Sequence, residues 1–222
     1  MELNKSGDRL KGAQAFCQSM LNEKMQSVGV KPMSYEIYLR AFKMEKELEV
    51  WMKNEEESKW QLFITYPFCE TSGKLGPKRM EGDLQIPEGF YHIDRYNPTS
   101  KFYLSLGINY PNASDKILSD AKKPGSDIFI HGGCATVGCI PITDEKIAEL
   151  YVLAEAAFRQ GQREVPVHIF PVRMEEKQLR KIANSYPEHI KFWKRLRVGY
   201  DHFELNRELL EFSVDSDGSY LF

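Results

Sequence analysis

Hydrophobic side chains recur at helical spacing in two parts of the chain. Positions three and four apart share one face of a helix, so each pattern predicts an amphipathic helix. The first pattern lies within residues 8–28 and ends at Gly29, with apolar side chains at Leu10, Ala13, Phe16, Cys17, Met20 and Leu21. The second predicts a helix over residues 144–160, with Thr143 as N-cap and Gly161 at the end. Its apolar stripe consists of Ile147, Leu150, Tyr151, Ala154 and Phe158.

Three consecutive stretches alternate with a period of two, which is typical of strands. They are EIYLRAF, KELEVWMK and SKWQLFITYPF. The second places Leu48, Val50 and Met52 on one side, and the third places Trp60, Leu62 and Ile64 on one side. We expect successive antiparallel strands, although residues 35–53 also fit a helix. Later stretches with strand character are KFYLSLGINYP, DIFI and VPVHIFPV.

The rest of the chain indicates loops and charged helices. Residues 71–111 are dense in glycine and proline, which favours loops before KFYLSLGINYP. Two charged stretches, around residues 175–185 and 187–210, have helical character. The pattern predicts an α+β fold, without an internal repeat or a linker between two domains. We divide the chain into an N-terminal helical segment, residues 1–33, and a main domain, residues 34–222.

Composition narrows the classes of function. The chain has 222 residues and a formal charge of −2, so it offers no broad basic field for nucleic acid. A local basic cluster, Lys191, Lys194, Arg195 and Arg197, is interpreted as a solvated helix face. No apolar segment approaches the roughly twenty residues needed to cross a bilayer, and we expect no membrane insertion. The opening residues lack the apolar core of a secretory leader, so export requires a leader that was removed before Met1.

The segment DIFIHGGCATVGCIPITD carries the clearest candidate chemistry. A short strand delivers His131, and a glycine-rich turn leads to Cys139 shortly before a helix. An imidazole that accepts the thiol proton makes the sulfur a nucleophile, and backbone N–H groups of Gly138 and Cys139 are candidates to stabilise an oxyanion. We predict that the imidazole and the helix terminus lower the thiol pKa of Cys139.

Other interpretations of the cysteines and histidines stay open. Cys134 and Cys139 beside a histidine resemble half of a zinc site, but no second Cys/His pair with ligand spacing occurs, and we expect no metal or cofactor. A disulfide between these two cysteines is a further alternative, and it would silence the nucleophile. Cys17 and Cys69 are interpreted as core residues. Four histidines are expected to be packed or solvated, namely His92, His168, His189 and His202.

Several motifs together resemble the L,D-transpeptidase catalytic domain (YkuD-like) family, and in particular its YafK-like murein branch. The motifs are SGKLGPK, EGDLQIPEGFY, INYPN, IHGGCATVGCIPITD and VHIFPVRM, which occur in the family's order after about residue 35. The resemblance implies a β-rich fold with mixed sheets and peripheral helices. It also implies a cysteine acyltransferase of the bacterial cell envelope, periplasmic after removal of a leader.

The resemblance implies roles for particular residues. Cys139 resembles the nucleophile, His131 its base, and Gly132 the position whose carbonyl orients the imidazole; the substrate would be a peptidoglycan stem peptide, attacked at the L,D bond after the diamino acid. The chain departs from the broad pattern in its shorter interval between His131 and Cys139, in Thr136 where serine is commoner, and in Pro141 in place of arginine. The short interval is typical of the YafK-like branch, whose members also cleave links.

A second group of residues is a candidate substrate-binding set. Its members are Lys78, Arg79, Asp83, Tyr110 and Thr136. Charged hydrogen bonds suit the carboxylates and amine of a stem peptide, while loop architecture and turn closure are equally weighted interpretations. Three functions are carried forward: an L,D-transpeptidase, a murein L,D-endopeptidase or amidase that hydrolyses the same amide or releases a murein-linked lipoprotein, and an inactive peptidoglycan-binding module.

Overall fold

The computed structural model describes residues 8–222, and its central feature is one mixed sheet. Eight strands pair in the order β3-β2-β1-β8-β4-β5-β6-β7. Their bounds are β1 Tyr35–Phe42, β2 Glu47–Asn54, β3 Gln61–Pro67, β4 Gly89–Asn97, β5 Ser105–Ile108, β6 Phe129–His131, β7 Ile140–Pro141 and β8 Val165–Phe170. Neighbours pair antiparallel, except that β1 with β8 and β6 with β7 are parallel. The predicted α+β class with a mixed sheet is confirmed.

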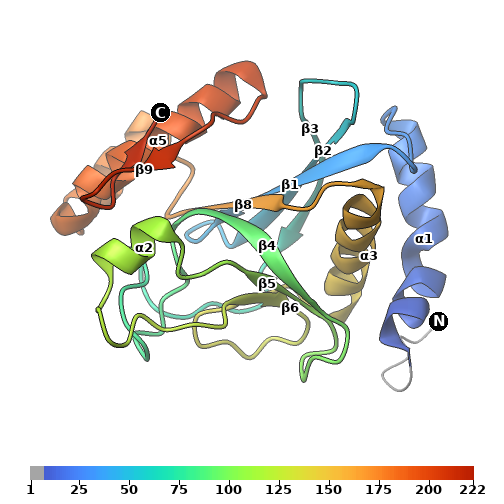
Figure 1. Cartoon of the computed structure of the whole chain (residues 1–222), viewed down its shortest axis with the longest axis horizontal. Helices are drawn as coiled ribbons and strands as arrows, with labels where there is room; N and C mark the ends of the chain where they lie inside the picture. The colour runs from blue at the N-terminus through green and yellow to red at the C-terminus, as the bar shows by residue number, and fades with distance from the viewer. Residues whose placement is uncertain (1–7) are drawn as a thin grey trace.

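Helices lie on two sides of this sheet (Figure 1). On one side α1 packs beside α3, and on the other α5 lies with the small hairpin β9–β10 near the C-terminus. The bounds are α1 Arg9–Ser27, α2 Ala113–Leu118, α3 Asp144–Gln160, α4 Glu176–Ala183, the 3₁₀ turn η1 Pro187–His189, α5 Ile190–Asn206, β9 Ser213–Val214 and β10 Tyr220–Leu221. The expectation of peripheral helices at both ends of the chain is therefore confirmed for the described residues.

Strand β1 shows why the sheet needs two covering layers. Its alternate residues Ile37 and Leu39 belong to the core that α1 and α3 share, whereas Tyr38 packs among the aromatic residues under α5. Both faces of the strand are therefore buried, which explains why most residues of β1 are apolar. The buried face of α1 belongs to the same core as α3. The division of the chain into a helical segment and a main domain at residue 33 stays a prediction.

The helix predictions for residues 8–28 and 144–160 are confirmed, as are the first three strands. The prediction that Trp60, Leu62 and Ile64 share one side of the third strand is wrong, since Leu62 is exposed and the next residue, Phe63, is buried. The alternation is interrupted where the register of β2 with β3 shifts, between Val50 and Trp51. Thr143 occupies the N-cap position of α3, but its side chain makes no capping hydrogen bond.

Two elements are not predicted from the sequence. β4 runs through the middle of the glycine- and proline-rich region and pairs with both β8 and β5. Apart from Gly89, its first residue, the glycines and prolines of the region lie outside the strand, and its apolar residues are packed by tertiary contacts that a local pattern does not report. α2 is a six-residue helix that begins with a capping box between Asn112 and Asp115.

Candidate active site

The sheet register brings the predicted nucleophile and base to one place. Parallel pairing aligns Ile130 with Ile140, so Cys139 lies next to Phe129 at the start of β7. The Phe129 N–H donates to Cys139 Sγ at 3.3 Å. Alternate residues of a strand point to the same face, so Phe129 and His131 share a face. Cys139 lies beside Phe129 and therefore lies on the same face as His131. Both Cys139 and His131 line one pocket.

This pocket has a volume of about 290 Å³ and a mostly apolar wall. Its lining residues come from the β4–β5 connection, the segment before β6, and the site itself: Asn97, Ser100, Lys101, Phe102, Ser105, Asp127, Phe129, His131 and Cys139. Two of them carry charge, Lys101 and Asp127. The sequence interpretation missed every lining residue except the last two; Asp127 and Phe129 lie in the motif segment but were not singled out, and the remainder lie between residues 97 and 105, outside the motifs.

His131 is held firmly, with only 2% of its surface exposed. Its Nδ1 lies 2.6 Å from the Gly132 carbonyl oxygen, and since a carbonyl only accepts, Nδ1 carries the proton. Nε2 is then the basic nitrogen. The ring also stacks on Phe102, with centroids 4.5 Å apart. Burial lowers the pKa of His131 below its usual value, while the bond to Gly132 acts in the opposite direction.

Cys139 is a partly buried free thiol. Burial raises its pKa above the usual value, and the Phe129 N–H opposes that rise. The prediction of a lowered thiol pKa is therefore wrong, because desolvation outweighs the groups that lower it; α3 begins only five residues later.

The backbone of Cys139 is fixed by Thr136. The Cys139 N–H donates to Thr136 Oγ1 at 2.9 Å, and the same hydroxyl donates to the Cys139 carbonyl at 2.8 Å. The N–H that was expected to face an oxyanion is thus directed at a side chain in this structure. Gly138 has φ +121°, and a Cβ there would lie 3.0 Å from the Gln85 carbonyl oxygen, so a side chain is strained at this turn.

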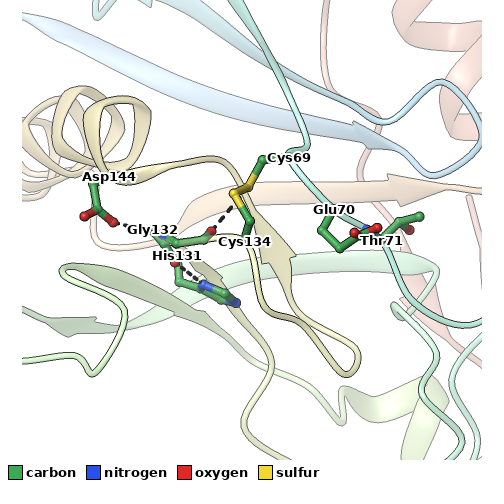
Figure 2. Close-up of a disulfide and its surroundings, with 8 residues drawn as sticks. Cys69, Glu70, Thr71, His131, Gly132, Cys134 and Asp144 are labelled. Carbon is green, nitrogen blue, oxygen red and sulfur yellow. Dashed lines mark hydrogen bonds between the residues drawn. A yellow bond between two sulfur atoms is a disulfide. The ribbon is translucent and has the colours of Figure 1, made fainter.

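A disulfide joins Cys69 to Cys134, with Cα atoms 5.5 Å apart (Figure 2). Cys69 follows β3, where its N–H donates to the Pro141 carbonyl, and so it lies beside the turn that carries Cys134. Two earlier interpretations are corrected. Cys69 is not a plain core residue, and Cys134 is paired with Cys69 rather than with Cys139. No spacing signal in the sequence links residues so far apart.

The disulfide also removes Cys134 from the zinc alternative, because a disulfide sulfur is not a thiolate. Within residues 8–222 no three histidine, cysteine or acidic side chains cluster as metal ligands would. The same residues include no helix that is both long and apolar enough to span a membrane.

The candidate substrate-binding residues of the loop after β3 have partners inside the protein. Lys78 Nζ donates to Asp83 Oδ1 at 2.6 Å, and Arg79 Nη1 donates to Asp115 Oδ1 at 2.9 Å. Tyr110 donates its hydroxyl proton to the Pro124 carbonyl at 2.8 Å. Among the described residues none of these side chains lines the pocket of Cys139. Their substrate-binding role stays a prediction.

The family model of the L,D-transpeptidase catalytic domain, YkuD, matches residues 45–169. The chain belongs to this family, a class of murein enzymes with peptidoglycan as substrate. The Escherichia coli (strain K12) protein named "Putative L,D-transpeptidase YafK" is 36% identical over 174 residues, covering 78% of this chain and 68% of that protein. The crystal structure of the helical cell shape determining protein Pgp2 from Campylobacter jejuni is 18% identical, with a TM-score of 0.49, over 87% of this chain and 80% of that one.

Proposed function

We propose that this chain is a cysteine acyltransferase of the cell envelope that opens an amide of peptidoglycan stem peptides, with Cys139 as nucleophile and His131 as base. One observation carries the proposal: the imidazole at the end of β6 and the thiol directly before the neighbouring strand β7 line the same pocket. Family membership supplies the substrate class, and the bond attacked is the L,D amide after the diamino acid.

The pKa directions define how the reaction starts. The raised thiol pKa and the lowered imidazole pKa mean that both groups are neutral at pH 7. Proton transfer therefore accompanies attack: as Sγ bonds to the carbonyl carbon, the thiol proton moves to Nε2 of His131. The imidazolium then gives this proton to the leaving amine nitrogen, and a thioester on Cys139 and a free amine result.

Two glycines have supporting roles in this proposal. The Gly132 carbonyl holds Nδ1–H and so leaves Nε2 as the nitrogen that accepts the thiol proton. The Gly138 N–H is the proposed oxyanion donor, since the Cys139 N–H is directed at Thr136.

The thioester has two fates. Attack by the amine of a second stem peptide completes transpeptidation, and attack by water completes hydrolysis. The short turn between His131 and Cys139 favours the second fate as an alternative function, because it leaves little chain with which to build an acceptor site. A hydrolase of this kind is an L,D-endopeptidase or an amidase that releases a murein-linked protein.

The test uses the purified full chain with its disulfide intact. A tetrapeptide stem is incubated with and without a D-amino acid acceptor, and mass spectrometry separates exchange from hydrolysis. A carbapenem is then added, and the intact mass is measured. We expect turnover, and a single covalent adduct that is lost in Cys139→Ala.

Two matched variants serve as controls. Cys17→Ala removes the other free thiol, and the pair Cys69→Ala/Cys134→Ala removes the disulfide; both should keep the adduct. An adduct that persists in Cys139→Ala contradicts the assignment of the nucleophile. Turnover that persists there contradicts the covalent mechanism as a whole.

A further inference from the structure

The peptide bond between Gly132 and Gly133 is hydrogen-bonded on both sides. Its carbonyl accepts from Nδ1 of His131 at 2.6 Å, and its N–H donates to Asp144 Oδ1 at 2.9 Å. Figure 2 shows this order, with the Asp144 carboxylate, the glycine segment and the imidazole in sequence. A single planar peptide group thus lies between a carboxyl group and the proposed base.

We propose that Asp144 is a positioning residue that acts on His131 through this peptide. The inference rests on the proposed function, since it assigns a third member to the Cys139–His131 pair. Hydrogen bonds in a chain polarise one another, so a carboxylate at the N–H makes the carbonyl a stronger acceptor for Nδ1–H. A stronger acceptor stabilises the imidazolium that forms during attack and holds the ring with Nε2 toward the thiol.

The local fold brings Asp144 close to the peptide. Asp144 is the first residue of α3, and a Cβ added to Gly132 would lie 2.5 Å from its Oδ1 and 2.7 Å from the Phe102 carbonyl oxygen. Only a residue without a side chain fits between these two oxygens. The disulfide lies on the other side of the turn, where the Gly133 carbonyl oxygen is 3.3 Å from Cys69 Sγ.

An alternative interpretation is that Asp144 only stabilises the N-terminus of α3, as acidic residues in the first turn of a helix do. The chain offers a matched control for that effect, because Glu145 lies in the same first turn and is exposed. If the helix terminus alone matters, Asp144→Asn and Glu145→Gln will have equal effects. If the hydrogen bond through the peptide matters, only substitutions of Asp144 will change the pKa and the tautomer of the His131 imidazole.

Other charged groups near His131 stay the same in these variants. The pocket contributes Lys101 and Asp127, and Asp127 is paired with Arg95 at 2.7 Å. The Cys139 thiol is the remaining titratable group in the pocket wall. A change in the titration of His131 between Asp144 and Glu145 variants therefore reports on Asp144.

The experiment follows the imidazole directly by NMR of the full chain labelled with ¹⁵N-histidine, alongside steady-state kinetics on the stem peptide. In Asp144→Ala we expect the pKa of His131 to move to lower pH and a mixture of ring tautomers to replace the Nδ1–H form. The acid limb of kcat/KM should shift in the same direction. We expect kcat to fall about tenfold, the effect of one hydrogen bond, with KM unchanged.

Asp144→Asn keeps an oxygen that accepts from the Gly133 N–H, so it should retain the tautomer and lose part of the pKa effect. It also keeps the test decisive if the alanine variant does not fold. Unchanged His131 titration and tautomer in both variants, or equal shifts in Glu145→Gln, would overturn the proposal. Because these readouts need no turnover, they are independent of whether Cys139→Ala abolishes the reaction.

Discussion

The turn of residues 132–139 and the loop of residues 76–88 both carry polar residues that the sequence marks as functional, and the fold uses them in opposite ways. Thr136 in the turn and Asp144 after it accept from backbone N–H groups of the turn, while the Cys139 thiol and the imidazole of His131, just before the turn, line a pocket. In the loop, Asp83 alone accepts from Lys78 Nζ and from three backbone N–H groups.

The difference teaches that residue type alone does not separate a ligand site from a folded loop. A loop without regular structure leaves many backbone N–H groups to satisfy, and a carboxylate is a strong acceptor for them. In the turn, Asp144 and Thr136 accept from the Gly133 and Cys139 N–H groups, while the thiol and the imidazole line the pocket. Substitutions should therefore lower stability in the loop and activity in the turn.

The largest expected effect on stability concerns the disulfide that ties this turn to the end of β3. It closes a loop with a sequence separation of 65. In the chain-entropy model a loop of this length contributes about 4 kcal/mol. The pair Cys69→Ala/Cys134→Ala should lower the free energy of unfolding by about that amount and also lower kcat, because the turn loses its brace. Urea denaturation and steady-state kinetics measure the two effects.

Wild-type protein treated with dithiothreitol is the matched comparison, since it keeps every side chain and opens only the S–S bond. It should unfold at the same urea concentration as the double variant. Equal stability of oxidised and reduced protein would show that the Cys69–Cys134 link contributes nothing, and the proposed brace would be wrong.

The next effect belongs to the loop. Lys78 is 4% exposed, so Asp83→Ala leaves a buried ammonium without its carboxylate, together with unsatisfied N–H groups. Breaking such a pair costs about 3 kcal/mol of unfolding free energy. KM for the stem peptide should stay unchanged in the folded protein. A raised KM with unchanged stability would instead support the substrate-binding role predicted from the sequence.

The pH dependence sharpens this prediction. Burial opposes ionisation of Asp83, but Lys78 and the backbone N–H groups outweigh it and hold the pKa of this carboxyl below its usual value. A lowered folded-state pKa contributes stability above the unfolded-state pKa of about 4, and the contribution is lost as pH falls through the folded-state pKa. Asp83→Asn should therefore flatten the acid side of the stability curve.

Much of this architecture follows from local pattern. The helices α1 and α3 and the strands β1 and β2 have regular periodicity, and the sequence predicts them. The motif around His131 and Cys139 is equally local, because eight residues connect a strand end to the next strand.

The parts that escaped prediction depend on pairing between distant segments. β4 is stabilised by β8, more than seventy residues later in the chain, and Cys69 is joined to Cys134 across a similar interval. The raised thiol pKa escapes prediction for a related reason, because the burial of Cys139 depends on tertiary packing that a local pattern does not report. In the sequence Asp144 has the pattern of an ordinary helix-terminal acid, and only the tertiary structure places its carboxylate against the Gly133 N–H.

The smallest effect is expected at Tyr110, which was predicted to bind substrate. Its hydroxyl donates to the Pro124 carbonyl, and its side chain is buried beside the loop of Lys78. Tyr110→Phe removes one hydrogen bond and should lower the free energy of unfolding by about 1 kcal/mol, with kcat and KM unchanged.

The matched control is Tyr66→Phe, which removes a hydroxyl bonded to Glu149 on α3, and neither residue lines the pocket of Cys139. Urea denaturation should give losses of similar size for the two variants, and neither should alter kinetics. A rise in KM in Tyr110→Phe but not in Tyr66→Phe would bring the phenol into contact with substrate. That result would assign Tyr110 to the substrate-binding residues, because a hydrogen bond that only closes a loop has no effect on substrate binding.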